Sequence, residues 1–147
     1  MLIMSASPAV HTLSLRVYAA DTDVSGIVHH SQYLVFAERA RTEMLRDHGI
    51  AGTSLGDVGA GFWIVRRAAV DYRNPARLDD ELMVLSRVVA ARGASCDIEQ
   101  RVERGEETLV QIDITAAFLD DQGRPMRMAA GWRSALASLA VGARDAW

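Results

Sequence analysis

One long amphipathic segment, residues 31–48, constrains the fold more than any other part of the sequence. Its apolar positions recur at i, i+3, i+4, i+7 and i+11, which places them on one face of a helix. These positions are Tyr33, Phe36, Ala37, Ala40 and Met44. Gly49 then supplies a typical C-terminal stop. A helix that is apolar on one face has to bury that face against a second layer of structure.

Runs of strand-like sequence on both sides of this helix predict the second layer. A short alternating run, residues 12–18, precedes the helix, and four longer runs follow at residues 62–72, 81–91, 94–103 and 108–119. Gly93 and Gly105 lie in the two shortest connections, where we expect hairpin turns with glycine at positive φ. This order predicts an α+β fold in which a curved antiparallel sheet wraps around one long central helix.

The 147 residues are predicted to form a single domain. Residues 1–11 are expected to be a poorly ordered lead-in. Residues 50–61 are expected to form a loop with one helical turn near Leu55. Residues 124–147 form a divergent tail, in which the weakly helical stretch 128–139 is expected to pack on a neighbour. Because long sheet edges require cover, pairing with a second subunit is one expected solution.

Composition argues against several classes of function. The formal net charge of −3 provides no dominant basic field, so we expect no nucleic-acid binding. The single cysteine, Cys96, rules out an internal disulfide framework and favours a reducing compartment. Its place in an alternating run indicates a packed side chain rather than a nucleophile. We find no secretory signal pattern, and no apolar run approaches the ~18 residues of a membrane span. We therefore expect a cytoplasmic protein.

The loop before the helix carries the residues most suited to chemistry. Asp21, Asp23, Gly26, His29 and His30 follow one another directly before the helix start. A helix start offers unpaired backbone N–H groups, and a carboxylate beside it can act on a carbonyl whose oxygen those groups hold. Aspartates in a turn also serve as caps and turn formers, so both readings stay open on spacing alone. Adjacent histidines lack the usual spacing of metal ligands, and we expect no metal site.

This loop and helix resemble the signature of hotdog-fold acyl-CoA thioesterases, in the 4-hydroxybenzoyl-CoA thioesterase superfamily. The similarity is greatest to the Tol–Pal-associated thioesterase subgroup. It rests on Tyr18-x-x-Asp21-Thr22-Asp23-x-x-Gly26-Ile27-Val28-x-His30-x-x-Tyr33-x-x-Phe36-x-Glu38-Arg39-Ala40-Arg41-Thr42-Glu43, and continues through Val70-Asp71-Tyr72 and Gln100-Arg101-Val102. The family's hotdog fold, a curved antiparallel sheet around a central helix, agrees with the order of elements expected above.

The resemblance implies hydrolysis of an acyl-CoA thioester, with no dissociable cofactor. Asp23 matches the family's catalytic aspartate and would act as nucleophile or as general base. The backbone N–H of His30 would polarise the carbonyl, while its imidazole could orient Asp23, bind a water or be satisfied by local backbone. We expect Asp21 to stabilise the loop. His29 departs from the aromatic residue usual at its position, which affects the expected lining of the acyl pocket.

Substrate-binding residues also follow from the resemblance. Gly26 would allow close approach of the acyl group, and Val28 and Tyr33 would shape its pocket. Arg67 and Arg92 are the expected contacts to the phosphates of coenzyme A, although surface arginines that only aid solubility are the alternative.

The sequence is also compatible with two other functions. A hotdog hydratase or dehydratase also uses an aspartate and a histidine, and Asp23 and His30 give a superficial match. An acyl-CoA or acyl-carrier-protein binding module associated with a cell-envelope complex is the non-enzymatic alternative. The resemblance further implies a homodimer joined edge to edge, or a homotetramer built from two such dimers, with active sites that draw on two subunits.

Overall fold

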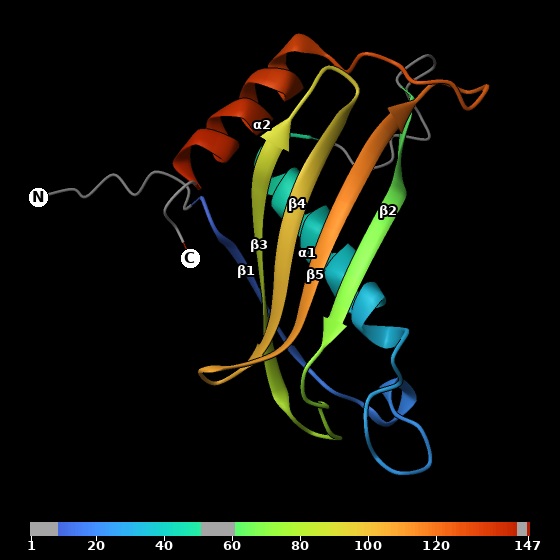
Figure 1. Ribbon diagram of the computed structural model, residues 1–147, viewed down its shortest axis with the longest axis vertical. Helices are drawn as coiled ribbons and strands as arrows, with labels where there is room; N and C mark the ends of the chain where they lie inside the picture. The colour runs from blue at the N-terminus through green and yellow to red at the C-terminus, as the bar shows by residue number, and fades with distance from the viewer. Residues whose placement is uncertain (1–8, 51–60, 144–146) are drawn as a thin grey trace, which may run out of the picture.

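The computed structural model describes residues 9–50, 61–143 and 147. In chain order the elements are β1 (His11–Arg16), the short 3₁₀ helix η1 (Ala19–Asp21), α1 (Gln32–Asp47), β2 (Phe62–Tyr72), β3 (Glu81–Ala91), β4 (Ser95–Arg104), β5 (Glu107–Leu119) and α2 (Ala130–Gly142). Figure 1 shows the sheet curving around α1, with α2 at one end. The predicted α+β hotdog architecture is confirmed.

The strands form one antiparallel sheet in the order β1-β3-β4-β5-β2. β3, β4 and β5 are joined by hairpins, whereas β2 enters on the far side of β5 and becomes an edge strand. Bulges interrupt the pairing of β2 between Val65 and Arg67 and that of β3 between Val88 and Ala90. Such bulges increase local twist and bend a strand, which fits a sheet that curves around a helix.

The core lies between α1 and the concave face of the sheet. All five residues of the predicted helix face are buried, together with Leu45. The inner face of β4 alternates as expected, with Cys96, Ile98, Gln100 and Val102 buried. Burial raises the pKa of the Cys96 thiol to about 12, so this cysteine is a packed core residue, as predicted.

The predicted positive φ is confirmed for only one of the two hairpin glycines. Gly105 has φ of 60° as expected, but the φ of Gly93 is not positive. The connection between β3 and β4 closes through other bonds, because Arg92 N–H donates to the Ser95 carbonyl at 2.8 Å. The Gly93 carbonyl accepts from Met128 N–H at 3.0 Å, which ties this hairpin to the segment before α2.

The described residues near each end of the chain are more structured than the sequence predicts. His11, assigned to the lead-in, begins β1 and lies 3.2 Å from the Asp47 carboxylate at the end of α1. The tail forms α2, which packs mainly against β3 and buries Leu136 and Leu139. Residues 1–8 of the expected lead-in, and the helical turn expected near Leu55, lie outside the described residues.

The edge strand β2 exposes apolar side chains. Phe62, Ile64, Val65 and Tyr72 are all more than a third exposed, and Val65 reaches 47%. Two neighbouring positions on α1, Leu34 and Val35, are exposed to a similar degree. An unpaired strand with an apolar surface is a template for pairing with another chain. Within the described ranges, no helix is long and apolar enough to cross a membrane.

Candidate active site

The loop between β1 and α1 is held by its own backbone. The Asp23 N–H donates to the Ile27 carbonyl at 3.0 Å, and the Gly26 N–H donates to the Asp23 carbonyl at 3.1 Å. Gly26 adopts φ of 80°, a conformation that favours glycine, and no atom lies within 4 Å of the position a Cβ would take. Isolated bridges from Thr22 to Val28 and from Ile27 to Arg77 fix the loop against the following chain.

The Asp23 carboxylate is exposed and held on one oxygen. Its Oδ1 accepts the Ser25 N–H at 2.8 Å and also the Ser25 hydroxyl. The side-chain and backbone hydrogen bonds from Ser25 lower the pKa of Asp23, and the nearby His29 acts in the same direction. Asp23 is therefore ionised at neutral pH. Among the described residues, none donates a hydrogen bond to its Oδ2.

Asp21 has the structural role expected of it. Its Oδ2 accepts the Tyr18 N–H at 2.8 Å, and its Oδ1 accepts the Gln32 side-chain amide at 2.9 Å. Its carbonyl also accepts the His29 N–H at 3.0 Å. One aspartate thus connects the end of β1, the loop and the first residue of α1. The two aspartates of the loop have separate roles, because only Asp23 keeps a carboxylate oxygen open.

His30 stands at the helix start and is held from β2. Its carbonyl accepts the Tyr72 hydroxyl at 2.9 Å, and its ring packs edge-on against the Tyr72 ring with centroids 6.5 Å apart. No described residue accepts a hydrogen bond from the His30 N–H. The imidazole is stacked on His29 at 4.4 Å and makes no hydrogen bond to Asp23 in the part of the chain that the structure describes. The backbone N–H of His30, rather than its ring, is therefore the group left available to donate a hydrogen bond to a ligand.

Val28 and Tyr33 lie in the core beside the loop. Val28 donates its N–H to the Ala76 carbonyl at 2.9 Å, and the Tyr33 hydroxyl accepts the Ala76 N–H at 2.9 Å. Burial raises the pKa of the Tyr33 phenol, so it stays neutral. Both residues are less than 5% exposed. Together they fix the segment after β2 against the helix start.

The two predicted phosphate contacts lie away from this loop. Arg67 is exposed on the edge strand β2. Arg92 follows Ala91, the last residue of β3, and β3 extends about 33 Å from Ala91 back to Glu81 at the end nearer the loop. Its guanidinium already forms a bidentate pair with Asp97, at 3.0 and 2.6 Å, and contacts Ser95 at 2.7 Å. The structure brings neither arginine to Asp23 within one chain.

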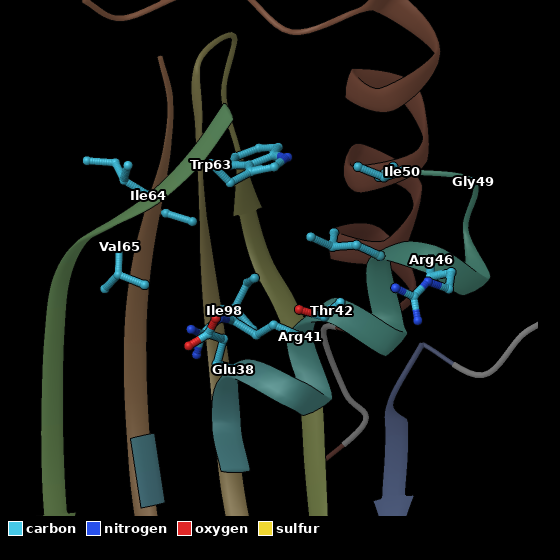
Figure 2. Close-up of a pocket in the computed structure, with 12 residues that line it drawn as sticks. Glu38, Arg41, Thr42, Arg46, Gly49, Ile50, Trp63, Ile64, Val65 and Ile98 are labelled. Atoms are coloured by element: carbon cyan, nitrogen blue, oxygen red, sulfur yellow. The ribbon is translucent and has the colours of Figure 1, made fainter. Parts of the chain in front are cut away.

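Sequence reasoning missed a pocket of about 740 Å³ between the C-terminal half of α1 and the start of β2 (Figure 2). Its walls are largely aliphatic, with the charged side chains of α1 on one side. The lining residues are Glu38, Arg41, Thr42, Leu45, Arg46, Gly49, Ile50, Trp63, Ile64, Val65, Ile98 and Ala116. The periodicity of α1 could have placed its polar members on one face, but not opposite β2.

Comparison with known proteins places this chain in a family. Residues 25–111, more than half of the chain, match the model of the Thioesterase superfamily. The chain belongs to that superfamily. The matched residues include the second half of the loop, the whole of α1 and three of the strands. No group of three potential metal-ligating side chains occurs among the residues that the structure describes.

Individual relatives agree with this assignment. The chain is 44% identical over 96 residues to the Acyl-CoA thioester hydrolase YbgC of Escherichia coli O6:H1, covering 65% of this chain and 71% of the relative. It is 40% identical over 106 residues to the Acyl-CoA thioesterase YbgC of Haemophilus influenzae, covering 72% and 78%. A probable thioesterase from Bartonella henselae superposes with a TM-score of 0.77 at 36% identity, over 82% of this chain and 99% of that one.

Proposed function

We propose that this thioesterase hydrolyses acyl-CoA thioesters to a free carboxylic acid and coenzyme A, at the junction of the loop and α1. The observation that carries the proposal is that one loop holds both an ionised Asp23 with an open carboxylate oxygen and, at the helix start, a His30 N–H that no described residue accepts. The YbgC relatives, named for the hydrolysis of acyl-CoA, support the same substrate class.

Two routes are compatible with these groups. As nucleophile, Asp23 Oδ2 attacks the thioester carbon and coenzyme A leaves as thiolate, forming a mixed anhydride that water then cleaves. As general base, Asp23 takes a proton from water, and hydroxide adds to the carbonyl. Collapse of that intermediate expels the thiolate, which receives the proton from Asp23. In both routes the His30 N–H, at the positive end of the α1 dipole, stabilises the developing oxyanion.

The other proposed contacts have supporting roles. Gly26 leaves open space beside the Asp23 loop, as an approaching acyl group requires. Val28 and Tyr33 form the wall behind it. Arg67 is the stronger candidate for a coenzyme A phosphate, because the charge of Arg92 is balanced by Asp97. The His30 imidazole is proposed to bind the attacking water or to shape the site together with Tyr72.

We propose a homodimer joined along β2, with pairing into a homotetramer. Support comes from the unpaired edge of β2 and from its exposed apolar side chains. An antiparallel pairing of two β2 strands would bring the Tyr72 end of one subunit near the Phe62 end of the other. Each site would then draw on two chains, including Arg67 or Arg92 of a partner. A cytoplasmic location is proposed from the lone buried Cys96.

Thiol release from a panel of acyl-CoAs tests the function, using the parent chain and Asp23→Asn. Asparagine keeps the shape and removes the charge, so we expect turnover to fall by ~10²–10⁴-fold while acyl-CoA still binds. Asp121→Asn, in an exposed turn, is the matched control and should retain full activity. Binding without any turnover by the parent would favour the binding module. Addition of water to an enoyl-CoA, without thiol release, would favour the hydratase.

A further inference from the structure

Three charged side chains of α1, Glu38, Arg41 and Arg46, line the pocket between α1 and β2, and Arg41 is the one that bonds to a core residue of the sheet. Figure 2 shows its side chain extending from α1 toward the strands, beside Ile98. Its Nη1 donates at 2.9 Å to Oε1 of Gln100, which lies in the middle of β4. This is the contact that fixes where the guanidinium lies.

Gln100 can offer only its oxygen to Arg41. The glutamine is fully buried, and its Nε2 donates to the Ala37 carbonyl at 2.9 Å and to the Ser86 hydroxyl at 2.8 Å. Both amide hydrogens are thereby used, so the amide cannot turn without leaving a buried donor unsatisfied. The Arg41 guanidinium is therefore held in one position by a rigid acceptor from the core.

The Arg41 side chain is partly buried, and its hydrogen bond to the core is to a neutral group. Burial lowers the pKa of Arg41, more than the attraction of Glu38, one turn earlier on α1, raises it. Glu38 is exposed, and no described acidic group lies within ion-pair distance of Arg41. The neutral Gln100 satisfies one of five N–H donors. A partly desolvated cation with unused donors is stabilised when an anion enters beside it.

The remainder of the pocket suits a hydrocarbon chain. Apart from Arg41 and its polar neighbours on α1, its walls include Ile64, Val65, Ile98 and Ala116. The same face of α1 continues back toward His30 through the exposed Leu34 and Val35. The rise from His30 to Arg41 is ~16 Å along the helix axis, shortened because helical side chains lean toward the N-terminus. An acyl chain of medium length spans this interval.

We infer that the pocket receives the distal end of the acyl group and that Arg41 selects acyl groups ending in a carboxylate. The substrates are thus coenzyme A monothioesters of dicarboxylic acids. This inference rests on the proposed hydrolysis of acyl-CoA and names the substrate class of that site. The thioester carbonyl lies at the His30 N–H, the methylene chain follows Leu34 and Val35, and the terminal carboxylate pairs with Arg41.

Matched substrates test the inference without altering the protein. Acyl-CoAs of roughly six to twelve carbons bracket the span, and each length is prepared with a terminal carboxylate, the primary amide of that carboxylate or a terminal methyl. We expect kcat/KM at the best length to be at least tenfold higher for the carboxylate than for the amide of equal size. Equal rates for carboxylate and amide, or hydrolysis of the methyl series alone, would overturn it.

Variants of Arg41 assign the preference to that residue. Arg41→Gln retains a donor toward Gln100 but removes the charge, and it should bring the ratio of kcat/KM for carboxylate to that for amide to about one. Arg41→Lys keeps the charge and should retain part of the preference. Arg39→Met, which removes an exposed arginine of the same helix, is the control. An equal loss in all three series with Arg41→Gln would assign Arg41 a structural role only.

Failure of the inference can be told apart from failure of the proposed function. If the parent hydrolyses the methyl series but not the carboxylates, the function stands and the inference is wrong. If no acyl-CoA is hydrolysed, the function is wrong, and binding of non-hydrolysable thioether analogues decides the inference. Tighter binding of the carboxylate analogue than of its amide, lost in Arg41→Gln, would support it, and equal binding would overturn it.

Discussion

The Tyr72 hydroxyl donates to the carbonyl of His30 at 2.9 Å, and this bond joins the end of the edge strand β2 to the start of α1. This bond bears on the proposed chemistry because His30 also carries the N–H proposed to stabilise the oxyanion. The two residues are 42 positions apart in the sequence. A strand proposed to form the dimer interface therefore also holds the end of the helix that is proposed to bind the oxyanion.

Tyr72→Phe is expected to lower kcat by about 3–10-fold, with a smaller change in KM. Loss of one hydrogen bond of ordinary strength releases the His30 carbonyl, so the adjoining N–H is positioned less well. Steady-state thiol release measures both constants. Thr108→Val is the matched control, since its hydroxyl donates to Glu103 in the distant hairpin between β4 and β5. Unchanged kcat in Tyr72→Phe would show that the bond does not position the site.

The acid limit of activity should depend on Ser25. The ionised Asp23 is the form proposed to act, and the hydrogen bonds from Ser25 lower its pKa, so the parent should remain active below the ordinary pKa of an aspartate. Ser25→Ala removes the hydroxyl bond and raises the pKa of Asp23. The ratio of variant to parent kcat/KM should therefore fall as the pH is lowered from 7 toward 4. Circular dichroism at each pH confirms that both proteins stay folded, and a constant ratio would contradict the prediction.

Local patterns in the sequence are sufficient for most of the fold. The buried face of α1 is predicted residue for residue, because periodicity reports which side of a helix meets a core. The bounds of β2 and β3 are likewise predicted, since alternation and turn residues are local signals. Gly93 is mispredicted because its carbonyl bond to Met128 depends on a segment 35 residues away.

The site is predicted only in part, for the same reason. The loop with Asp23 precedes the helix start in the sequence itself, so its place could be inferred. The contact of Arg41 with Gln100 joins residues 59 positions apart, and no pattern within one segment specifies it. The family resemblance indicated that both residues belong to quoted motifs, but not that they touch.

A charge on the edge of β2 should separate the subunits. Val65→Asp places a carboxylate on the apolar edge strand, where two copies would bring like charges together and desolvate them. We expect the parent to sediment at a multiple of the 16.0 kDa chain mass, and Val65→Asp to sediment as a monomer with little activity. Val89→Asp, on β3, is the control, because Val89 is 39% exposed against 47% for Val65. An active parent monomer would contradict the proposed dimer.

Gly49 and Gly61 have the same φ but different surroundings, so replacing each with alanine distinguishes the cost of backbone strain from that of a steric clash. Gly61 and Gly49 both have φ of 73°, but a Cβ on Gly61 would lie 2.6 Å from the Leu119 carbonyl oxygen and 2.8 Å from the Phe118 ring. A Cβ on Gly49 meets nothing within 4 Å. Gly49→Ala should therefore lower the free energy of unfolding by about 1–2 kcal/mol, the cost of a left-handed conformation.

Gly61→Ala adds overpacking to that cost and should lower the free energy of unfolding by about 2–5 kcal/mol in total. Urea unfolding at one fixed protein concentration measures both variants, since subunit association stabilises the folded chain. Equal losses for the two variants would mean that Phe118 and Leu119 move aside to accommodate the added Cβ at no cost in stability. A larger loss at Gly61 shows that only glycine allows β2 to begin this close to the end of β5.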